Sequence, residues 1–206
     1  MLVNMGKIQA IIFDWGGVLV EDPAPGLVRY CAKTLGVSEE KYKHAYGICI
    51  DDFQTGKVTE KQFWMNMTGR LNVSMPTVNS LWGEAFASVY VPRVELFSLA
   101  DRLREKGCKI ALLSNTEMPC VEFFKRQKYD VFNVTVFSCI EGVSKPNRAI
   151  YERTLNRLGT LAGQTLFIDD RQDYIDGAKQ AGLQTILFKN VGRLKKKLAG
   201  FSLNVL

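Results

Sequence analysis

The sequence predicts an α/β protein with a doubly wound parallel sheet and a small helical domain inserted after the first strand. Two observations predict the sheet: short apolar runs without polar alternation, as in strands covered on both faces, and helical patterns between the later runs. The insertion follows from a third, because about seventy residues separate the first apolar run from the next core helix, whereas such connections usually take roughly two to six. We therefore expect a core of residues 1–19 and 94–206 and a helical lid of residues 20–93.

Five apolar runs have the length of strands and are rich in Ile, Val, Phe or Thr. They are IQAIIF (8–13), KIALL (109–113), VTVFS (134–138), TLFI (165–168) and QTILF (184–188). Core helices are expected where apolar residues recur at helical spacing before a glycine, over 92–107, 147–159 and 173–182. Inserted helices are expected over 26–36, 39–53, 59–71 and 77–90.

The sequence also predicts two details of the inserted segment. Thr59 and Gln62 form a capping-box pattern that opens the third inserted helix. Trp64, Trp82 and Phe86 are expected to pack between the lid and the core rather than to contact a ligand.

The composition is that of an ordinary soluble globular chain, with 47% apolar and 23% charged residues among 206. The formal net charge of +6 suits an anionic ligand but is too dispersed to indicate nucleic acid. The cluster Lys195–Lys197 lies between Leu194 and Leu198, so we interpret it as the solvated face of a helix. We expect neither a nucleic-acid partner nor a membrane, since no apolar run approaches the roughly 18 residues of a span.

Cysteine and histidine usage excludes further classes. The five cysteines show no C-x-x-C pair and are interpreted as reduced core residues of a cytoplasmic protein. No signal-peptide pattern is present at the N-terminus. The single histidine, His44, lies on a charged stretch of the expected lid, which argues against Ser-His-Asp hydrolysis and His-based zinc chemistry.

Chemically active side chains follow the expected strands. Asp14 ends the first, Ser114 and Asn115 end the second, and Asp169 and Asp170 end the fourth. Ligands of open parallel sheets bind at this edge, where the loop after the third strand adds Lys145. Three carboxylates close together require a cation, and oxygen ligands select Mg²⁺. Such an ion with a lysine and a hydroxyl suits phosphoryl transfer, in which a carboxylate can attack phosphorus.

Four segments, FDWGGVLV, ALLSNT, GVSKPNRAIY and FIDDRQDYIDGAKQAG, resemble in order and spacing the four motifs of the haloacid dehalogenase superfamily. The helical insertion lies at the position of its small type 1 cap, and the first motif is similar to that of sugar-phosphate phosphatases. The resemblance implies that Asp14 is the nucleophile, that Ser114 and Lys145 are catalytic, and that Mg²⁺ is bound by Asp14, the Gly16 carbonyl, Asp169 and Asp170. Asn115 is assigned to substrate binding.

The chain departs from this pattern at two positions. Most phosphatases of the superfamily carry an acid/base Asp where this chain has Gly16, and an Asn or Asp where it has Tyr174. General acid catalysis contributes about 10² to 10⁴ in rate. If the chain is a phosphatase, water, a lid residue such as Glu21 or Asp22, or an acidic leaving group such as that of a sugar 1-phosphate must compensate. Asp173, the neighbour of Tyr174, would point about 100° away on a helix.

Three functions remain open. The favoured one is a Mg²⁺-dependent phosphatase acting on a small phosphorylated metabolite through an aspartyl phosphate. A catalytically impaired relative that binds a phosphorylated ligand or a partner protein is the alternative. A 2-haloacid dehalogenase is disfavoured, because the pair Asp169-Asp170 would repel an anionic haloacid.

Two basic residues of the insertion are further candidates for substrate binding. The loop Phe53–Glu60 corresponds to the family's substrate-selecting loop, and its Lys57 could meet a second anionic group. Arg29 on the first inserted helix has the same status. No heptad pattern or uninterrupted apolar helix face commits the chain to oligomerisation, so a monomer or weak dimer is expected.

Overall fold

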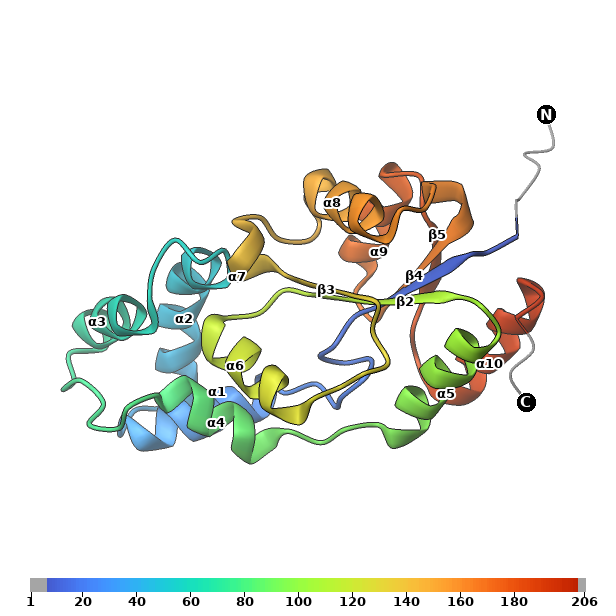
Figure 1. Ribbon diagram of the computed structural model, residues 1–206. Helices are drawn as coiled ribbons and strands as arrows, with labels where there is room; N and C mark the ends of the chain where they lie inside the picture. The colour runs from blue at the N-terminus through green and yellow to red at the C-terminus, as the bar shows by residue number, and fades with distance from the viewer. Residues whose placement is uncertain (1–6, 204–206) are drawn as a thin grey trace.

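The computed structural model describes residues 7–203 and contains, within them, one sheet of five parallel strands (Figure 1). The spatial order is β3-β2-β1-β4-β5. Their bounds are β1 (Ala10–Phe13), β2 (Lys109–Ser114), β3 (Val134–Phe137), β4 (Thr165–Asp169) and β5 (Gln184–Leu187). At the centre, Phe13 of β1 lies opposite Leu112 of β2 and Ile168 of β4. The predicted parallel sheet is confirmed, and the carboxyl ends of β2, β1 and β4 are neighbours.

Both faces of the sheet are covered, which explains why the strands do not alternate with polar residues. Successive side chains of a strand point to opposite faces. Ile11 and Phe13 accordingly join one apolar cluster, and Ala10 and Ile12 join the other. The first face packs against α5 (Val94–Glu105), α6 (Met118–Gln127) and α10 (Val191–Gly200), and the second against α8 (Arg148–Leu158) and α9 (Gln172–Gln180). The connections also contain α7 (Ser138–Glu141) and the 3-10 turn η1 (Ala162–Gln164).

Four further helices follow β1 and lie together at one end of the molecule (Figure 1). We call them the inserted helices: α1 (Ala24–Thr34), α2 (Glu39–Gln54), α3 (Glu60–Leu71) and α4 (Leu81–Val89). The chain enters and leaves this segment at adjacent points, because Val20 pairs with Pro92 in an antiparallel bridge. Arg93 fastens the junction by donating from Nη1 to the carbonyl oxygens of Gly17, Val18 and Val20.

Local sequence signals explain most helix ends. The Thr59 hydroxyl accepts from the Gln62 amide N–H while the Gln62 side chain accepts from Thr59, which confirms the capping box. Helix α4 starts later than the expected residue 77, because the Ser80 side chain caps it by accepting from Gly83 N–H. Helix α6, whose first turn contains Pro119, was not predicted from the sequence.

Trp64, Trp82 and Phe86 are all buried, as their predicted packing role requires, although Trp82 and Phe86 also line the cavity described below. All five cysteines are buried with free thiols. Within residues 7–203, no helix combines the length and apolar character that crossing a membrane requires.

Candidate active site

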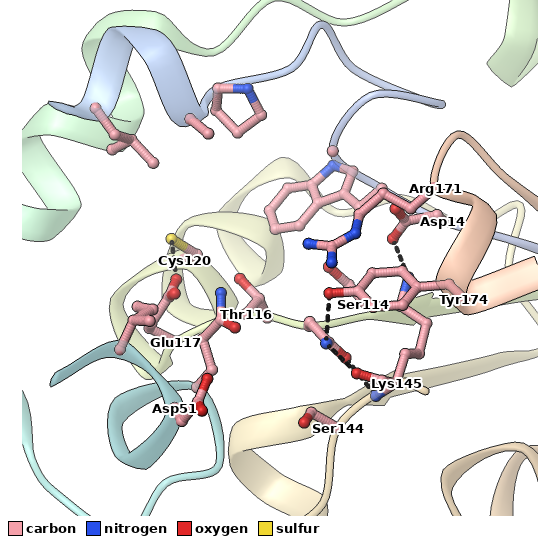
Figure 2. A pocket seen from close by; sticks show the side chains of 18 of the residues that line it. Asp14, Asp51, Ser114, Thr116, Glu117, Cys120, Ser144, Lys145, Arg171 and Tyr174 are labelled. Atoms are coloured by element: carbon pink, nitrogen blue, oxygen red, sulfur yellow. Dashed lines mark hydrogen bonds and ion pairs between the residues drawn. The ribbon is translucent and has the colours of Figure 1, made fainter. Parts of the chain in front are cut away.

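Polar side chains gather where three neighbouring strands end. Asp14 follows β1, Ser114 ends β2 and Asp169 ends β4, while the loop between α7 and α8 brings Lys145 to the same edge. A cavity of about 790 Å³ opens between this edge and the inserted helices (Figure 2). Its lining includes most of the predicted site residues, namely Asp14, Gly16, Lys57, Ser114, Asn115, Lys145 and Asp170.

The ammonium group of Lys145 is buried between two carboxylates. Its Nζ lies 2.8 Å from Asp14 Oδ1 and 2.7 Å from Asp169 Oδ2. Burial alone would lower the pKa of Lys145, but the two carboxylates together raise that pKa above its usual value. Lys145 is therefore a permanent positive charge held beside Asp14.

Asp14 is the buried carboxylate that the apolar first strand leads into, and only 6% of its surface is exposed. Burial raises the pKa of Asp14 to about 7; Lys145 opposes this rise and Asp169 adds to it. Because a nearby positive charge favours the ionised carboxylate, a cation bound on its other side would keep Asp14 charged at neutral pH.

Three carboxylates form a group that fits a cation. Asp14, Asp169 and Asp170 each offer an oxygen, and these oxygens lie within 4.8 Å of one another. An all-oxygen donor set of this kind suits Mg²⁺. Both oxygens of Asp169 already have partners, however: Oδ2 pairs with Lys145, and Oδ1 accepts from the Arg171 N–H at 2.9 Å. Asp14 and Asp170 are thus the side chains with more capacity to hold an ion, while Asp169 also orients the lysine.

At both glycines after Asp14, Gly16 and Gly17, a side chain would meet a neighbouring residue, and the neighbour differs between the two positions. Gly17 has a φ of +84°, and a Cβ there would lie 2.3 Å from Asp170 Oδ2, so the carboxylate packs directly on its backbone. A Cβ on Gly16 would lie 3.2 Å from Cδ of Pro23. Pro23 would therefore crowd a side chain at the position where most phosphatases of the superfamily carry an acid, although Gly16 itself lines the cavity.

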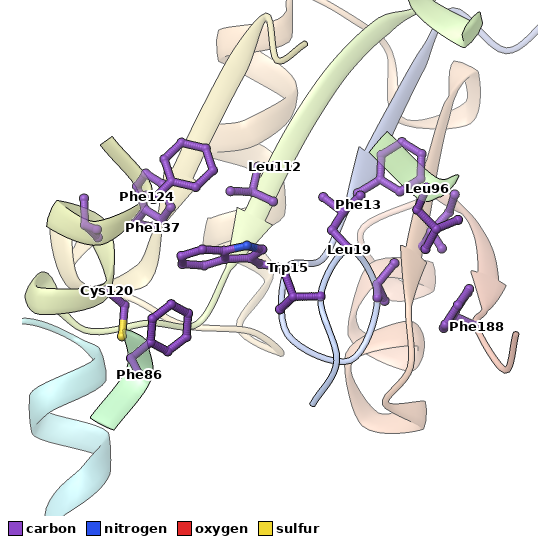
Figure 3. Close-up of a cluster of buried hydrophobic side chains, with 14 of the residues drawn as sticks. Phe13, Trp15, Leu19, Phe86, Leu96, Leu112, Cys120, Phe124, Phe137 and Phe188 are labelled. Carbon is purple, nitrogen blue, oxygen red and sulfur yellow. The ribbon is translucent and has the colours of Figure 1, made fainter. Parts of the chain in front are cut away.

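Trp15 connects the Asp14 loop to two helices. Its ring centroid lies 5.0 Å from that of Phe86 on α4 and 5.3 Å from that of Phe124 on α6 (Figure 3). Such tilted and edge-on aromatic pairs pack favourably beyond the area they bury. The residue after Asp14 thus anchors the loop in the core on the side of the inserted helices.

Asn115 holds the lysine loop in place. Its Oδ1 accepts from the Lys145 backbone N–H at 2.8 Å, and its Nδ2 donates to the Lys145 carbonyl oxygen at 2.9 Å. Nδ2 also lies 3.1 Å from the hydroxyl of Tyr174. These contacts occupy the amide group that was assigned to substrate binding from the sequence, although Asn115 does line the cavity.

Tyr174 stands where the family usually has an Asn or Asp. Its ring centroid lies 4.7 Å from Lys145 Nζ and 4.1 Å from the guanidinium carbon of Arg171. A cation over an aromatic face is attracted by the ring quadrupole. The neighbouring Asp173 does not replace the missing side chain, because its carboxylate pairs with Arg171.

The two basic candidates of the insertion differ in position. Lys57 lines the cavity and pairs with Asp52 at 3.2 Å. Arg29 is not among the lining residues; its side chain is 74% exposed and its Nε lies 3.8 Å from Glu39. The structure therefore does not bring Arg29 to the site, because α1 turns that residue toward solvent.

Of the two acids predicted as possible proton donors, one lines the cavity and the other does not. Asp22 lines the cavity, and its Oδ1 accepts from the backbone N–H of Ala24 at the start of α1. Glu21 is absent from the lining and pairs with Arg93 at 2.9 Å.

Sequence reasoning missed one buried acid of the cavity. Glu117 is 4% exposed, and its Oε2 accepts from the Trp82 indole N–H at 2.9 Å. Burial raises the pKa of Glu117, although hydrogen bonds from Gln54 and Trp82 oppose the rise. The sequence shows that Glu117 lies three residues after Ser114, but it does not show that Glu117 pairs with Trp82, which is 35 residues away.

Comparison with known proteins gives the class that this fold and site define. Residues 8–182 match the haloacid dehalogenase-like hydrolase family, and the chain belongs to that family. It is 23% identical to sesquiterpene phosphatase astK of Aspergillus oryzae over 85% of this chain and 87% of that protein. Phosphatase MT3486 of Mycobacterium tuberculosis is 21% identical over 92% and 91%.

Solved structures share the fold. The family enzyme bt-2542 of Bacteroides thetaiotaomicron, in complex with magnesium and inorganic phosphate, has a TM-score of 0.74. It is 21% identical over 91% of this chain and 98% of its own. The predicted fold and family are confirmed.

Proposed function

We propose that this chain is a Mg²⁺-dependent phosphatase that hydrolyses a small phosphorylated metabolite through an aspartyl phosphate on Asp14. The observation that carries the proposal is the buried pair of Asp14 and Lys145, 2.8 Å apart, beside the carboxylate of Asp170 in a cavity. Membership of a hydrolase family and likeness to two phosphatases support the reaction class.

Asp14 is the nucleophile in this proposal. Its carboxylate attacks phosphorus, the bond to the leaving oxygen breaks, and water then hydrolyses the acyl phosphate to restore Asp14. Lys145 neutralises charge on Asp14 and on the phosphoryl oxygens, since its Nζ is fixed by Asp169 on the far side. The Ser114 hydroxyl, which lines the cavity, donates to a phosphoryl oxygen.

The carboxylate group fits a resident Mg²⁺. Asp14, Asp170 and the backbone carbonyl of Gly16 would hold it, with Asp169 behind them. When bound, Mg²⁺ offsets the negative charge of the carboxylates and of the phosphoryl oxygens. The solved complex of bt-2542 with magnesium and phosphate supports this assignment by likeness of fold.

The leaving oxygen must take a proton, and Gly16 cannot supply one. Asp22 is the better placed of the two predicted donors, because it lines the cavity whereas Glu21 is held by Arg93. Substrates with an acidic leaving group, sugar 1-phosphates and acyl phosphates among them, need this help least.

The inserted helices act as a lid in this proposal, with boundaries at residues 20–93. A closed lid would exclude water and admit only small substrates. We further propose a cytoplasmic protein that is a monomer or a weak dimer, with no nucleic-acid partner.

An impaired, ligand-binding relative is the second candidate. The specific observation in its favour is that Pro23 lies against Gly16, so the acid/base position lacks an acid and has little room for a side chain. Such a protein would bind a phosphorylated ligand at the same site but would not hydrolyse it.

The test is phosphate release from a panel of small phosphate esters graded by leaving-group pKa, with and without a chelator. We expect Mg²⁺-dependent release that rises steeply with leaving-group acidity. Absence of release across the panel, together with retained binding of inorganic phosphate, would overturn the phosphatase in favour of the binding protein.

A further inference from the structure

Arg171 is a cationic side chain of the cavity that the proposed reaction does not use. It follows the pair Asp169-Asp170, and in Figure 2 its guanidinium lies over the ring of Tyr174 and faces the cavity near Asp14. Its side chain is 56% exposed, so a ligand in the cavity can reach it.

The guanidinium is held in one orientation. Nε lies 3.1 Å and Nη2 2.6 Å from the two oxygens of Asp173, and the guanidinium carbon stands 4.1 Å from the centre of the Tyr174 ring. The Tyr174 ring beneath the guanidinium is itself fixed, because Asn115 contacts the Tyr174 hydroxyl and the ring is largely buried. A group held on two sides loses little conformational entropy when it binds a ligand.

Arg171 also keeps hydrogen-bond donors in reserve. A guanidinium carries five N–H donors in a planar fork, and Asp173 takes only Nε and one from Nη2. Within residues 7–203, Nη1 makes no hydrogen bond or ion pair.

The other cations of the cavity are lysines that also have carboxylate partners. Among the described residues that line it, three side chains are cationic: Lys57, Lys145 and Arg171. Lys145 is enclosed by Asp14 and Asp169, and Lys57 pairs with Asp52. Arg171 also pairs with a carboxylate, Asp173, but it is the cation of this lining whose planar guanidinium keeps an Nη1 unpaired within the described residues, and it directly follows Asp170 at the phosphate end of the cavity.

From this geometry we propose that Arg171, mounted on Tyr174, is a subsite for a second anionic group of the substrate, a carboxylate or a second phosphate. The inference rests on the proposed function and narrows its substrate class to phosphate esters that carry such a group next to the transferred phosphoryl. Planar carboxylates and phosphates are the acceptors that a guanidinium fork binds best.

The test compares two non-hydrolysable ligands of nearly equal shape, phosphonoacetate and its neutral amide, phosphonoacetamide, by calorimetry in the presence of Mg²⁺. The wild type should bind phosphonoacetate about tenfold more tightly than the amide. Arg171→Gln should abolish the difference and leave the affinity for the amide within about twofold, and Arg171→Lys should retain only part of it. Arg29→Gln, an exposed arginine outside the cavity, is the matched control and should keep the full difference.

The outcomes separate the two proposals. Equal binding of both phosphonates by the wild type, or an unchanged preference in Arg171→Gln, would overturn the anionic subsite alone. Failure of the wild type to bind either phosphonate or to hydrolyse any ester of the panel would contradict the proposed function.

Discussion

The ammonium of Lys145 lies 4.7 Å from the centre of the Tyr174 ring. The ring therefore takes the place of the polar side chain that the family usually has at this position, and it contacts the lysine through its aromatic face. A neutral ring supports the lysine without adding a further negative charge to a site that already holds three carboxylates.

Removal of the ring should impair catalysis more than removal of its hydroxyl. Tyr174→Phe keeps the aromatic face and loses only the contact with Asn115, so kcat should stay within about threefold of the wild type. Tyr174→Leu loses a cation–π interaction of about 1–2 kcal/mol and should lower kcat by roughly tenfold. Steady-state kinetics on the best ester of the panel decide, and equal losses in the two variants would mean that the ring face has no role.

The metal site should depend on the absence of a side chain at Gly17. In Gly17→Ala the new methyl group would clash with the Asp170 carboxylate, 2.3 Å away, so the Mg²⁺ concentration needed for half-maximal activity should rise at least tenfold. Gly36→Ala is the matched control, because Gly36 also has a positive φ, +68°, but no atom lies within 4 Å of its Cβ position.

Both alanine variants should lose about 1–2 kcal/mol of stability from the left-handed backbone. Only Gly17→Ala should change the Mg²⁺ requirement. If the two proteins need similar Mg²⁺ concentrations for half-maximal activity, Asp170 is not a ligand of the metal.

Docking of the inserted helices should depend on Gly56. This residue has a φ of +69°, and a Cβ would lie 2.1 Å from the carbonyl oxygen of Cys139 on α7. Two residues earlier, the Gln54 carbonyl oxygen accepts from the Ser138 hydroxyl at 2.6 Å. Gly56→Ala should therefore push the α2–α3 turn off the core and raise KM several-fold.

Gly47→Ala supplies the control for this variant, since Gly47 lies inside α2 with open space at its Cβ position. It should stabilise the protein by about 1 kcal/mol through helix propensity and leave KM unchanged. Unchanged KM in Gly56→Ala would show that the contact with Cys139 does not control access to the cavity.

Glu117 should make stability fall as pH rises. Burial raises its pKa in the folded protein, so the protonated folded form is favoured; this contribution is fully present below the unfolded-state pKa and is lost as pH rises through the folded-state pKa. Each tenfold gain in proton affinity on folding corresponds to about 1.4 kcal/mol of stability. Glu117→Gln keeps an acceptor for Trp82 without the charge, and its free energy of unfolding should exceed that of the wild type by a margin that grows as pH rises above the unfolded-state pKa of Glu117. Parallel stability curves for the two proteins would contradict this interpretation.

Much of the fold was predictable because its signals are local. Unalternating apolar runs predict covered strands, and three of the five runs lead directly into site residues, as Phe13 leads into Asp14. The capping box of Thr59 and Gln62 lies within four residues and could be read with equal ease.

The remaining features of the site depend on contacts between distant segments. Asn115 was assigned to the substrate, but its amide bonds a loop thirty residues away. Glu117 accepts a hydrogen bond from Trp82 of the insertion, 35 residues away. Arg29 appeared equivalent to Lys57 in sequence, and only the orientation of α1 separates them.

The central claim is that Asp14 attacks phosphorus, and the most direct measurement is phosphate release by Asp14→Asn beside the wild type on the best ester of the panel. Asparagine keeps the size of the side chain and an acceptor for Lys145, so the fold should be retained, as a thermal unfolding scan will show. We predict a loss of at least about 10³-fold in kcat, or roughly 4 kcal/mol. A folded Asp14→Asn protein that retains activity within tenfold of the wild type would contradict a nucleophilic role for Asp14.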